Sequence, residues 1–284
     1  MPAPELGDTG FRVDAGLATL GPEALELRNE LDAIFTGWGA RAGAVAMAYP
    51  PLIAADDLTA LDYWENFPHL AMTATGLRED RRQNLVVDSA RPAVDHAALC
   101  DAGHVLPSSA CYPAYLGLGG MKVPDNHLIT TVATCFRNES HFDGLRRLLG
   151  FTMREVIFLG SRAEVLCRVA DFKRLTSEFI AALGLPVEVR PARDPFFDAD
   201  SRRSLMLSLF PAKEEFVYGD TVAISSVNFH RNFFGERCGI RTEDGEYAFS
   251  GCIGFGLERW LHALAEHFGS FEAALAEVRK EASA

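Results

Sequence analysis

Two residues of opposite charge lie two positions apart in the segment "TCFRNES". The residues at 128–137 are rich in β-branched side chains and predict a strand, which would point Arg137 and Glu139 to one face. On a face that lines a polar pocket, Arg137 could bind a carboxylate or phosphate through two hydrogen bonds, and Glu139 could accept one from an amino group. An ordinary ion pair near a sheet edge is the alternative, and the segment alone leaves both open.

A second segment, "FSGCIGFGLERW" at 249–260, combines three glycines, a cysteine and an arginine. Its glycines follow a GxxGxG pattern, which differs from the GxGxxG of a dinucleotide-binding loop and excludes that interpretation. Glycines where a strand passes into a helix permit the close approach of a ligand or of another backbone segment. Arg259 would lie near the positive end of that helix, which is favourable when an anion binds there. The segment therefore indicates a phosphate or carboxylate ligand.

The cysteines show neither a CxxC pair nor a short metal-binding spacing. They are Cys100, Cys111, Cys135, Cys167, Cys238 and Cys252. In a cytoplasmic protein we expect them to be mostly reduced. A lone cysteine is usually a small buried apolar residue, so spacing alone assigns none of them to a metal.

Composition restricts the class of protein. The 284 residues carry a net charge of −12, which disfavours general binding to nucleic acid, although 76–84 and 144–150 are locally basic. The sequence contains no run of about 18 apolar residues, so it predicts no membrane span. The first residues lack the pattern of a signal peptide, so we expect a cytoplasmic protein without membrane association.

The elements that must position these residues alternate between helices and turn-linked strands. Apolar periodicity predicts helices at 22–35 and 164–183 and a helix from Leu257 through the C-terminus. A short buried strand is expected within 42–53, and further strands at 128–137, 154–160, 215–229 (two strands) and 246–256. Because most of these strands are joined by turns, we expect an α+β fold, an antiparallel sheet flanked by helices.

The residues "CFRNE", "GFTMREV" and "GFGLERW" resemble motifs 2 and 3 of class II aminoacyl-tRNA synthetases, and 22–53 is similar to motif 1. The resemblance implies a single catalytic domain over 1–284, with motif 2 at about 128–160, an inserted helix at 161–183 and motif 3 at about 247–265. Within the class, "AISSVNFH" looks closest to seryl-tRNA synthetases, and the cysteine before motif 3 resembles their zinc-dependent archaeal type. A chain of this length without a tRNA-binding domain is similar to the amino acid:[carrier protein] ligases.

This resemblance implies an ATP site. Arg137 and Arg259 match the catalytic arginines that contact the α- and γ-phosphates, Glu139 lies near adenine, and Phe151 stacks on it. The remaining residues expected to contact ATP are Arg146, Arg147, Lys213, Ala223, Ile224, Ser225 and Ser226. Ala223 stands where the family has an acid that helps hold Mg²⁺, so Asp220 or Glu215 could replace it.

The resemblance also implies a zinc site. Cys111, Glu155 and Cys252 match the three zinc ligands of the archaeal type, and they would leave one tetrahedral position for the amino group of the substrate. Glu155, Asn228 and Ser250 are expected to contact that amino acid. From the residues alone, Cys111 and Cys252 could equally be buried packing residues, and Glu155 a surface residue of a strand.

The function implied is activation of a small amino acid, glycine or alanine, with ATP and Mg²⁺, followed by transfer to the phosphopantetheine thiol of a carrier protein rather than to tRNA. A homodimer formed through motif 1 is expected, with part of the carrier-docking surface on the helix at 161–183. Two alternatives are a free-standing seryl-tRNA synthetase-like enzyme that charges tRNA and a catalytically silent paralogue that acts as a binding module.

Overall fold

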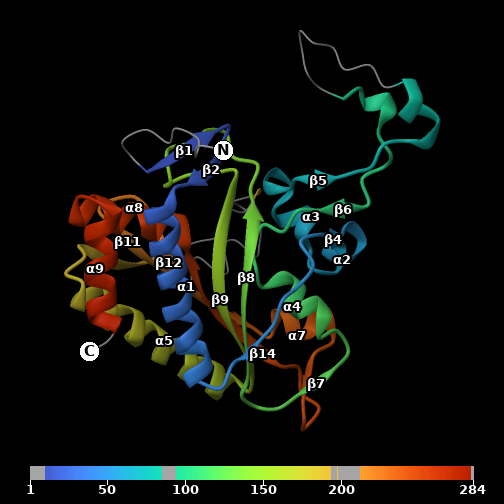
Figure 1. Cartoon of the computed structure of the whole chain (residues 1–284). Coiled ribbons are helices and arrows are strands. Elements are labelled where there is room, and N and C mark those ends of the chain that lie inside the picture. Colours follow the sequence, from blue (N-terminus) through green and yellow to red (C-terminus); the bar gives the residue numbers. More distant parts are fainter. Residues whose placement is uncertain (1–9, 85–93, 193–196, 198–211, 283–284) are drawn as a thin grey trace.

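A mixed, mainly antiparallel sheet forms the centre of the molecule (Figure 1). The computed structural model describes residues 10–84, 94–192, 197 and 212–282. The central path of the sheet runs β3-β8-β9-β14-β12-β11-β10, and the β1–β2 hairpin joins it where β2 meets the start of β9. The strands of this sheet are β1 (Phe11–Asp14), β2 (Leu17–Leu20), β3 (Val45–Ala46), β8 (His127–Phe136), β9 (Gly150–Gly160), β10 (Val187–Pro191), β11 (Lys213–Tyr218), β12 (Val222–Arg231) and β14 (Phe249–Gly256). A separate three-stranded sheet contains β4 (Ile53–Ala54), β6 (His104–Val105) and β5 (Thr73–Ala74), and a parallel pair is formed by β7 (Lys122–Val123) and β13 (Arg241–Thr242).

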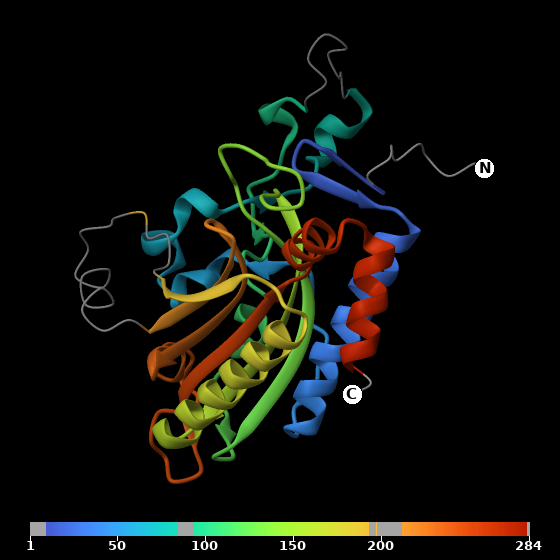
Figure 2. The ribbon, with the colours of Figure 1, turned by 90° about the vertical axis from the view of Figure 1, so that its left-hand side faces the viewer.

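The helices of the described residues are α1 (Pro22–Arg41), α2 (Ala55–Ala60), α3 (Tyr63–Asn66), η1 (Pro68–Leu70), η2 (Glu79–Asn84), η3 (His96–Ala98), α4 (Tyr112–Gly117), α5 (Arg162–Ala182), α7 (Phe233–Cys238), α8 (Leu257–Phe268) and α9 (Phe271–Ala282). The long helices α1, α5, α8 and α9 lie together on one face, and α4 and α7 lie on the other (Figures 1 and 2). Among the described residues, no helix is both long and apolar enough to cross a membrane.

The two faces carry separate apolar cores because side chains alternate along each strand. On β9, Val156 and Phe158 pack with the long helices, whereas Ile157 packs toward α4 and α7. On β14, Phe255 faces the long helices and Cys252 faces α4 and α7. The second face therefore carries Cys111 and Cys252, two of the residues singled out by the sequence.

The predicted α+β fold is confirmed, and so is the antiparallel pairing of β8 with β9 and of β11 with β12. The predicted helix at 164–183 is α5, whose first turn is capped by the Ser161 hydroxyl accepting from the Glu164 amide at 3.4 Å. The predicted helix at 22–35 is also present and continues to Arg41.

Three predicted details are wrong. The helix expected to run from Leu257 to the C-terminus is divided into α8 and α9, because Gly269 adopts a left-handed φ of 86° that ends the first helix. The strand expected within 42–53 is only the two-residue β3, and Val45 is 53% exposed rather than buried, since β3 is the outer strand beside β8.

The third correction concerns the first motif. β8 ends at Phe136, so Arg137 and Glu139 lie in the loop beyond the strand and not on one strand face. The Glu139 amide donates to the Arg137 carbonyl at 2.8 Å, which indicates a local turn rather than continued strand pairing. The side chains still converge on one site, as described below, but loop geometry brings them there.

Candidate active site

One pocket on the second face of the sheet collects the residues that the sequence assigned to ATP. All of them except Arg147 line it. The lining residues are Arg137, Glu139, Leu145, Arg146, Leu148, Phe151, Met153, Lys213, Glu215, Ala223, Ile224, Ser225, Ser226, Gly254, Gly256, Glu258 and Arg259. They come from the loop between β8 and β9 and from β9, β11, β12, β14 and the start of α8.

Arg137 lies over the ring of Phe151, with its guanidinium carbon 4.9 Å from the ring centroid. This is a cation–π distance. The Nε–H of Arg137 also donates to the Ser108 carbonyl at 3.2 Å, which fixes the stem of the side chain. A charged plane and an aromatic face are therefore held together at one end of the pocket.

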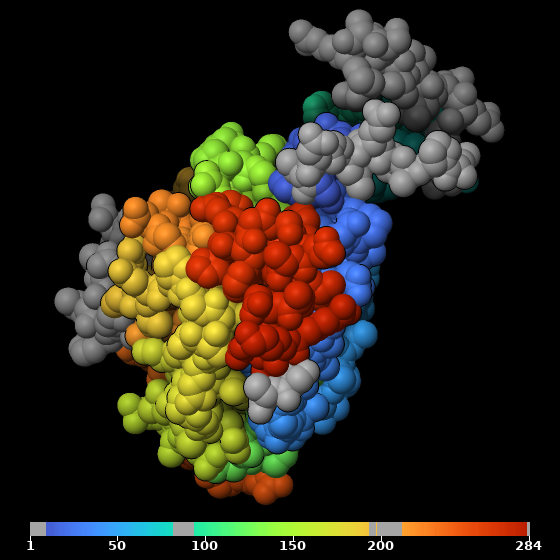
Figure 3. Space-filling view, turned by 60° about the vertical axis from the view of Figure 1, so that its left-hand side comes forward, coloured from blue at the N-terminus to red at the C-terminus, as the bar shows by residue number. Residues whose placement is uncertain are grey.

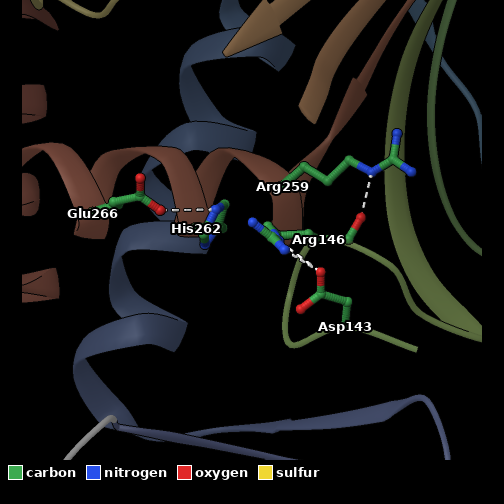
Figure 4. Close-up of polar contacts among 5 residues, drawn as sticks. All are labelled: Asp143, Arg146, Arg259, His262 and Glu266. Carbon is green, nitrogen blue, oxygen red and sulfur yellow. Dashed lines mark hydrogen bonds and ion pairs between the residues drawn. The ribbon is translucent and has the colours of Figure 1, made fainter. Parts of the chain in front are cut away.

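Charged side chains of the loop between β8 and β9 form ion pairs with one another. Arg147 donates to Glu139 Oε2 through Nε at 3.0 Å and Nη2 at 2.5 Å, so Arg147 contacts a lining residue without lining the pocket itself. Arg146 pairs with Asp143, its Nε lying 2.9 Å from Oδ2 (Figure 4). Both pairs are partly exposed, so they cost little to exchange for contacts with a ligand.

Arg259 links three elements at the mouth of the pocket. Its Nε–H donates to the Arg146 carbonyl at 2.9 Å (Figure 4), and its Nη1 donates to the Ala223 carbonyl at 3.1 Å. Desolvation and the nearby charge of Arg137 lower the pKa of Arg259. The guanidinium stays protonated, so Arg259 holds a largely desolvated positive charge close to that of Arg137, and an anionic ligand would stabilise both charges.

The acidic residues in and near the pocket differ in how freely they could bind a cation. Glu215 pairs with Lys213 at 3.0 Å across a partly exposed position. Glu258 is buried and accepts from the Thr152 amide at 2.7 Å, and its burial raises its pKa. Asp220 is 98% exposed and does not line the pocket. Of the two acids considered in place of Ala223, the structure therefore brings only Glu215 to the site.

The sequence did not indicate Glu258 as a site residue, although it directly precedes Arg259 in "LERW". The glycines of the same segment divide into two groups. Gly254 and Gly256 line the pocket. Gly251 does not line the pocket. A Cβ at this position would come within 2.8 Å of the Asn228 carbonyl oxygen and 3.1 Å of side chains of α5. Its absence of a side chain serves packing rather than ligand binding.

Farther along the same face, Cys111, Glu155 and Cys252 meet in a buried cluster. One ligand atom from each lies within 4.8 Å of the others. Cys111 is at the start of α4, whereas Glu155 and Cys252 come from the neighbouring strands β9 and β14. Residues separated by up to 141 positions in the sequence are thus assembled by strand pairing, which explains why spacing alone could not reveal them.

The carboxylate of Glu155 lacks a full set of partners. Its Oε1 accepts from the Ser109 hydroxyl at 2.9 Å and the Ala110 amide at 3.0 Å. Its Oε2 is buried without a hydrogen-bond partner among the described residues. A buried carboxylate oxygen that faces two thiols is costly unless a cation binds it. The donor set of two cysteines and one carboxylate fits zinc with one open position.

Crowding of three acids perturbs their protonation. Burial raises the pKa of Glu155. A hydrogen bond with Cys111 and burial raise the pKa of Cys252. For Cys111, a hydrogen bond with Cys252 lowers the pKa, but burial and the charge of Glu155 produce a net increase. A bound divalent cation would reverse these trends by stabilising the ionised forms.

Asn228 bridges the pocket and the cysteine cluster. Its Nδ2 lies 3.5 Å from Cys252 Sγ and 3.3 Å from Ser226 Oγ, and Ser226 lines the pocket. Ser250 lies beyond Cys252, where its hydroxyl is 3.4 Å from His230 Nδ1. The sequence assigned both Asn228 and Ser250 but missed His230, whose only signal is its alternation with Ser226 and Asn228 along β12.

Comparison with solved structures defines the class. The seryl-tRNA synthetase of M. kandleri, solved in complex with A. aeolicus tRNASec, superposes with a TM-score of 0.80 at 18% identity. The match covers 95% of this chain and 57% of the synthetase chain. The fold is thus that of a class II aminoacyl-tRNA synthetase catalytic domain, as the motifs predicted.

Comparison with curated proteins defines the family within that class. The chain is 33% identical to amino acid–[acyl-carrier-protein] ligase 1 of Bradyrhizobium diazoefficiens over 81% of its length and 73% of that protein. It is 30% identical to ligase 2 of the same organism, over 77% and 68% of the two chains. No protein-family model matches the sequence. The chain belongs to the amino acid–[acyl-carrier-protein] ligase family, which confirms the predicted ligase.

Proposed function

We propose that this ligase activates a small amino acid, glycine or alanine, with ATP and transfers it to the phosphopantetheine thiol of a carrier protein. One observation carries the proposal. The buried Cys111, Glu155 and Cys252 cluster, with its unpartnered Glu155 oxygen, lies on the same sheet face as a basic pocket and is joined to it through Asn228. A site for an amino group and a site for a triphosphate are therefore adjacent.

In this proposal the chain supplies positioning and charge rather than a covalent intermediate. Arg137 and Arg259 stabilise the negative charge that develops as the amino acid carboxylate attacks the α-phosphorus and pyrophosphate leaves. Phe151 provides the aromatic face for adenine, and Glu215 is the pocket acid that could bind Mg²⁺ in place of the missing acid at Ala223.

Cys111, Glu155 and Cys252 would hold zinc. When bound, zinc supplies an open coordination position that favours a free α-amino group. Asn228 and Ser250 then border the amino acid from the side of β12 and β14. For the second step, the phosphate of the adenylate could accept the thiol proton, because the pocket acids near it are already paired or buried.

The decisive measurement is ATP–pyrophosphate exchange with single amino acids. Exchange that depends on glycine or alanine supports the proposal, whereas the absence of exchange with every amino acid would favour a silent binding module. Labelled amino acid should then be offered to the holo carrier protein and to bulk tRNA. Labelling of the carrier is the expected result, and labelling of tRNA would favour the synthetase alternative.

We also propose that α5 contributes to carrier docking. The helix is exposed on the same side of the molecule as α8 and α9 (Figure 3). Three of its basic residues are paired with acids: Arg168 with Asp171, Lys173 with Glu214 and Arg174 with Glu178. An acidic carrier would compete for these pairs. Arg168→Glu should raise the KM for the carrier without changing pyrophosphate exchange, and an unchanged KM would remove α5 from the docking surface.

A homodimer through motif 1 is the proposed assembly. The outer strand β3, the residue that follows it and the neighbouring strand β8 expose Val45, Met47 and Val132 at 53%, 46% and 42%. Apolar side chains exposed together at a sheet edge are typical of an interface. Light scattering should give twice the mass of the chain, and Val45→Lys should shift that mass toward the monomer.

A further inference from the structure

Three side chains surround Cys252 on the side away from the ATP pocket: His230 on β12, Tyr115 on α4 and Ser250 on β14. Along β12, Ser226 lines the pocket, Asn228 lies beside Cys252, and His230 follows two residues later on the same face. Neither His230 nor Tyr115 takes part in the proposed reaction.

His230 contacts Cys252 through one ring nitrogen and two hydroxyls through the other. Its Nε2 lies 3.8 Å from Cys252 Sγ, and its Nδ1 lies 3.2 Å from Tyr115 Oη and 3.4 Å from Ser250 Oγ. A neutral imidazole has one donor and one acceptor nitrogen. If the Tyr115 hydroxyl donates to Nδ1, the proton resides on Nε2, which then donates to the sulfur.

The surrounding rings limit how far this histidine can turn. The ring of Tyr115 stacks on Phe234 with centroids 3.9 Å apart, and the His230 ring meets Phe234 edge-on at 5.0 Å. The orientation of the imidazole is therefore set by packing as well as by its hydrogen bonds. A donor fixed in this way can define the direction of the sulfur that accepts from it.

The geometry points to His230 as a positioning residue for Cys252: its Nε2–H, fixed by Tyr115, donates to the Cys252 thiolate and orients the thiolate toward the metal. The inference rests on the proposed zinc centre. Asn228 Nδ2, 3.5 Å from the same sulfur, supplies a second N–H donor. Glu155 receives comparable support from Ser109 and Ala110, and the Ser109 hydroxyl also lies 3.2 Å from Cys111 Sγ, so each of the three ligands has a partner outside the cluster. Such partners orient metal ligands and tune their donor strength.

The test compares zinc affinity and the cobalt–thiolate charge-transfer band in wild type, His230→Ala, His230→Gln, Tyr115→Phe and the double variant His230→Ala/Tyr115→Phe. Zinc affinity is measured by competition with a chromogenic chelator. Loss of the donor should weaken zinc binding about tenfold or more and shift the cobalt band to lower energy. Glutamine, whose amide can reach the position of Nε2, should restore part of both. His267→Asn and Tyr49→Phe, an exposed histidine and a half-buried tyrosine, are matched controls.

The double variant separates positioning from packing. If Tyr115 acts through His230, the single substitution Tyr115→Phe weakens zinc binding, but the same substitution causes no further loss of affinity when residue 230 is already alanine. Unchanged affinity and an unchanged cobalt band in His230→Ala and Tyr115→Phe would overturn the inference. If His230→Ala does not fold, an unchanged band in Tyr115→Phe overturns it alone. A wild-type enzyme that binds no zinc would instead refute the metal centre itself, and this inference with it.

Discussion

The basic pocket and the cysteine cluster are neighbouring parts of one sheet but are built in opposite ways. The pocket is partly exposed, and its charged side chains are held by ion pairs such as Arg146 with Asp143 that a ligand can replace. The cluster is buried, and Glu155 retains an oxygen without a partner among the described residues. Contacts that can be exchanged suit a polyanion that must bind and dissociate. A rigid set of buried donor atoms suits an ion that stays bound.

The largest expected effect comes from removing a donor of the cluster. Cys252→Ser should abolish stoichiometric zinc and lower kcat/KM for pyrophosphate exchange by about 1,000-fold or more, because several kcal/mol of binding and orientation are lost. Metal analysis and exchange kinetics check this. Cys167→Ser, which changes an exposed cysteine, should retain both zinc and activity. Full zinc content in Cys252→Ser would show that Cys252 is not a zinc ligand.

The next effect tests the pocket by itself. Arg259→Ala should lower kcat for exchange by about 100- to 1,000-fold, a typical result of removing a preorganised charge donor. Zinc content should remain that of the wild type, because Arg259 contacts Arg146 and Ala223 rather than the cluster. Loss of zinc in this variant would mean that the two regions are not independent, and the comparison above would fail.

A smaller effect should reveal which acid binds Mg²⁺. Glu215→Gln should raise the Mg²⁺ concentration for half-maximal exchange on the order of tenfold, because a hard cation loses a charged oxygen ligand. Asp220→Asn is the matched control, since this acid is 98% exposed outside the pocket. A titration of exchange rate against Mg²⁺ separates them. A shift in Asp220→Asn and none in Glu215→Gln would reverse the assignment.

The smallest expected effect concerns the ion pair between Arg146 and Asp143 in the loop between β8 and β9. Asp143→Asn should free Arg146 and lower the KM for ATP about twofold to fivefold, as expected from an exposed ion pair worth up to about 1 kcal/mol. Steady-state kinetics at low salt check this, and added salt should reduce the difference. A higher KM would indicate that Asp143 holds Arg146 in its binding position instead of competing for it.

The two regions also differ in how far the sequence could predict them. The motif residues of the pocket occur in short segments, "CFRNE" and "GLERW", which by themselves indicate only a polar site and an anionic ligand; the assignment to ATP comes from the resemblance to a family. The predicted strand ends at residue 137, one residue beyond the observed end at Phe136, since periodicity does not fix the end of a strand within a residue or two. The sequence offers both Asp220 and Glu215 as acids, and choosing Glu215 requires the structure, because the pairing of β11 with β12 brings it opposite Ser226.

The cluster could be predicted only through resemblance to a family. Its members come from three separate elements, and the residues by themselves allowed ordinary packing. The sequence also did not indicate the residues that form hydrogen bonds with the cluster. Ser109 and Ala110 orient Glu155 through a loop, and His230 reaches Cys252 from another strand. Such contacts depend on tertiary register, which a single sequence does not encode in any local pattern.

The strand β14 carries a residue of each region on the same side, Cys252 for the cluster and Gly254 and Gly256 for the pocket. A strand advances about 3.3 Å per residue, so the backbone of β14 sets the separation between Cys252, a ligand of the proposed zinc, and the glycines beneath the proposed triphosphate site. In the proposed reaction, the amino group binds at the first of these points and the carboxylate reacts near the second. A substrate whose amine and carboxylate are separated by one more carbon would not match this separation, so the proposed reaction implies discrimination against β-amino acids.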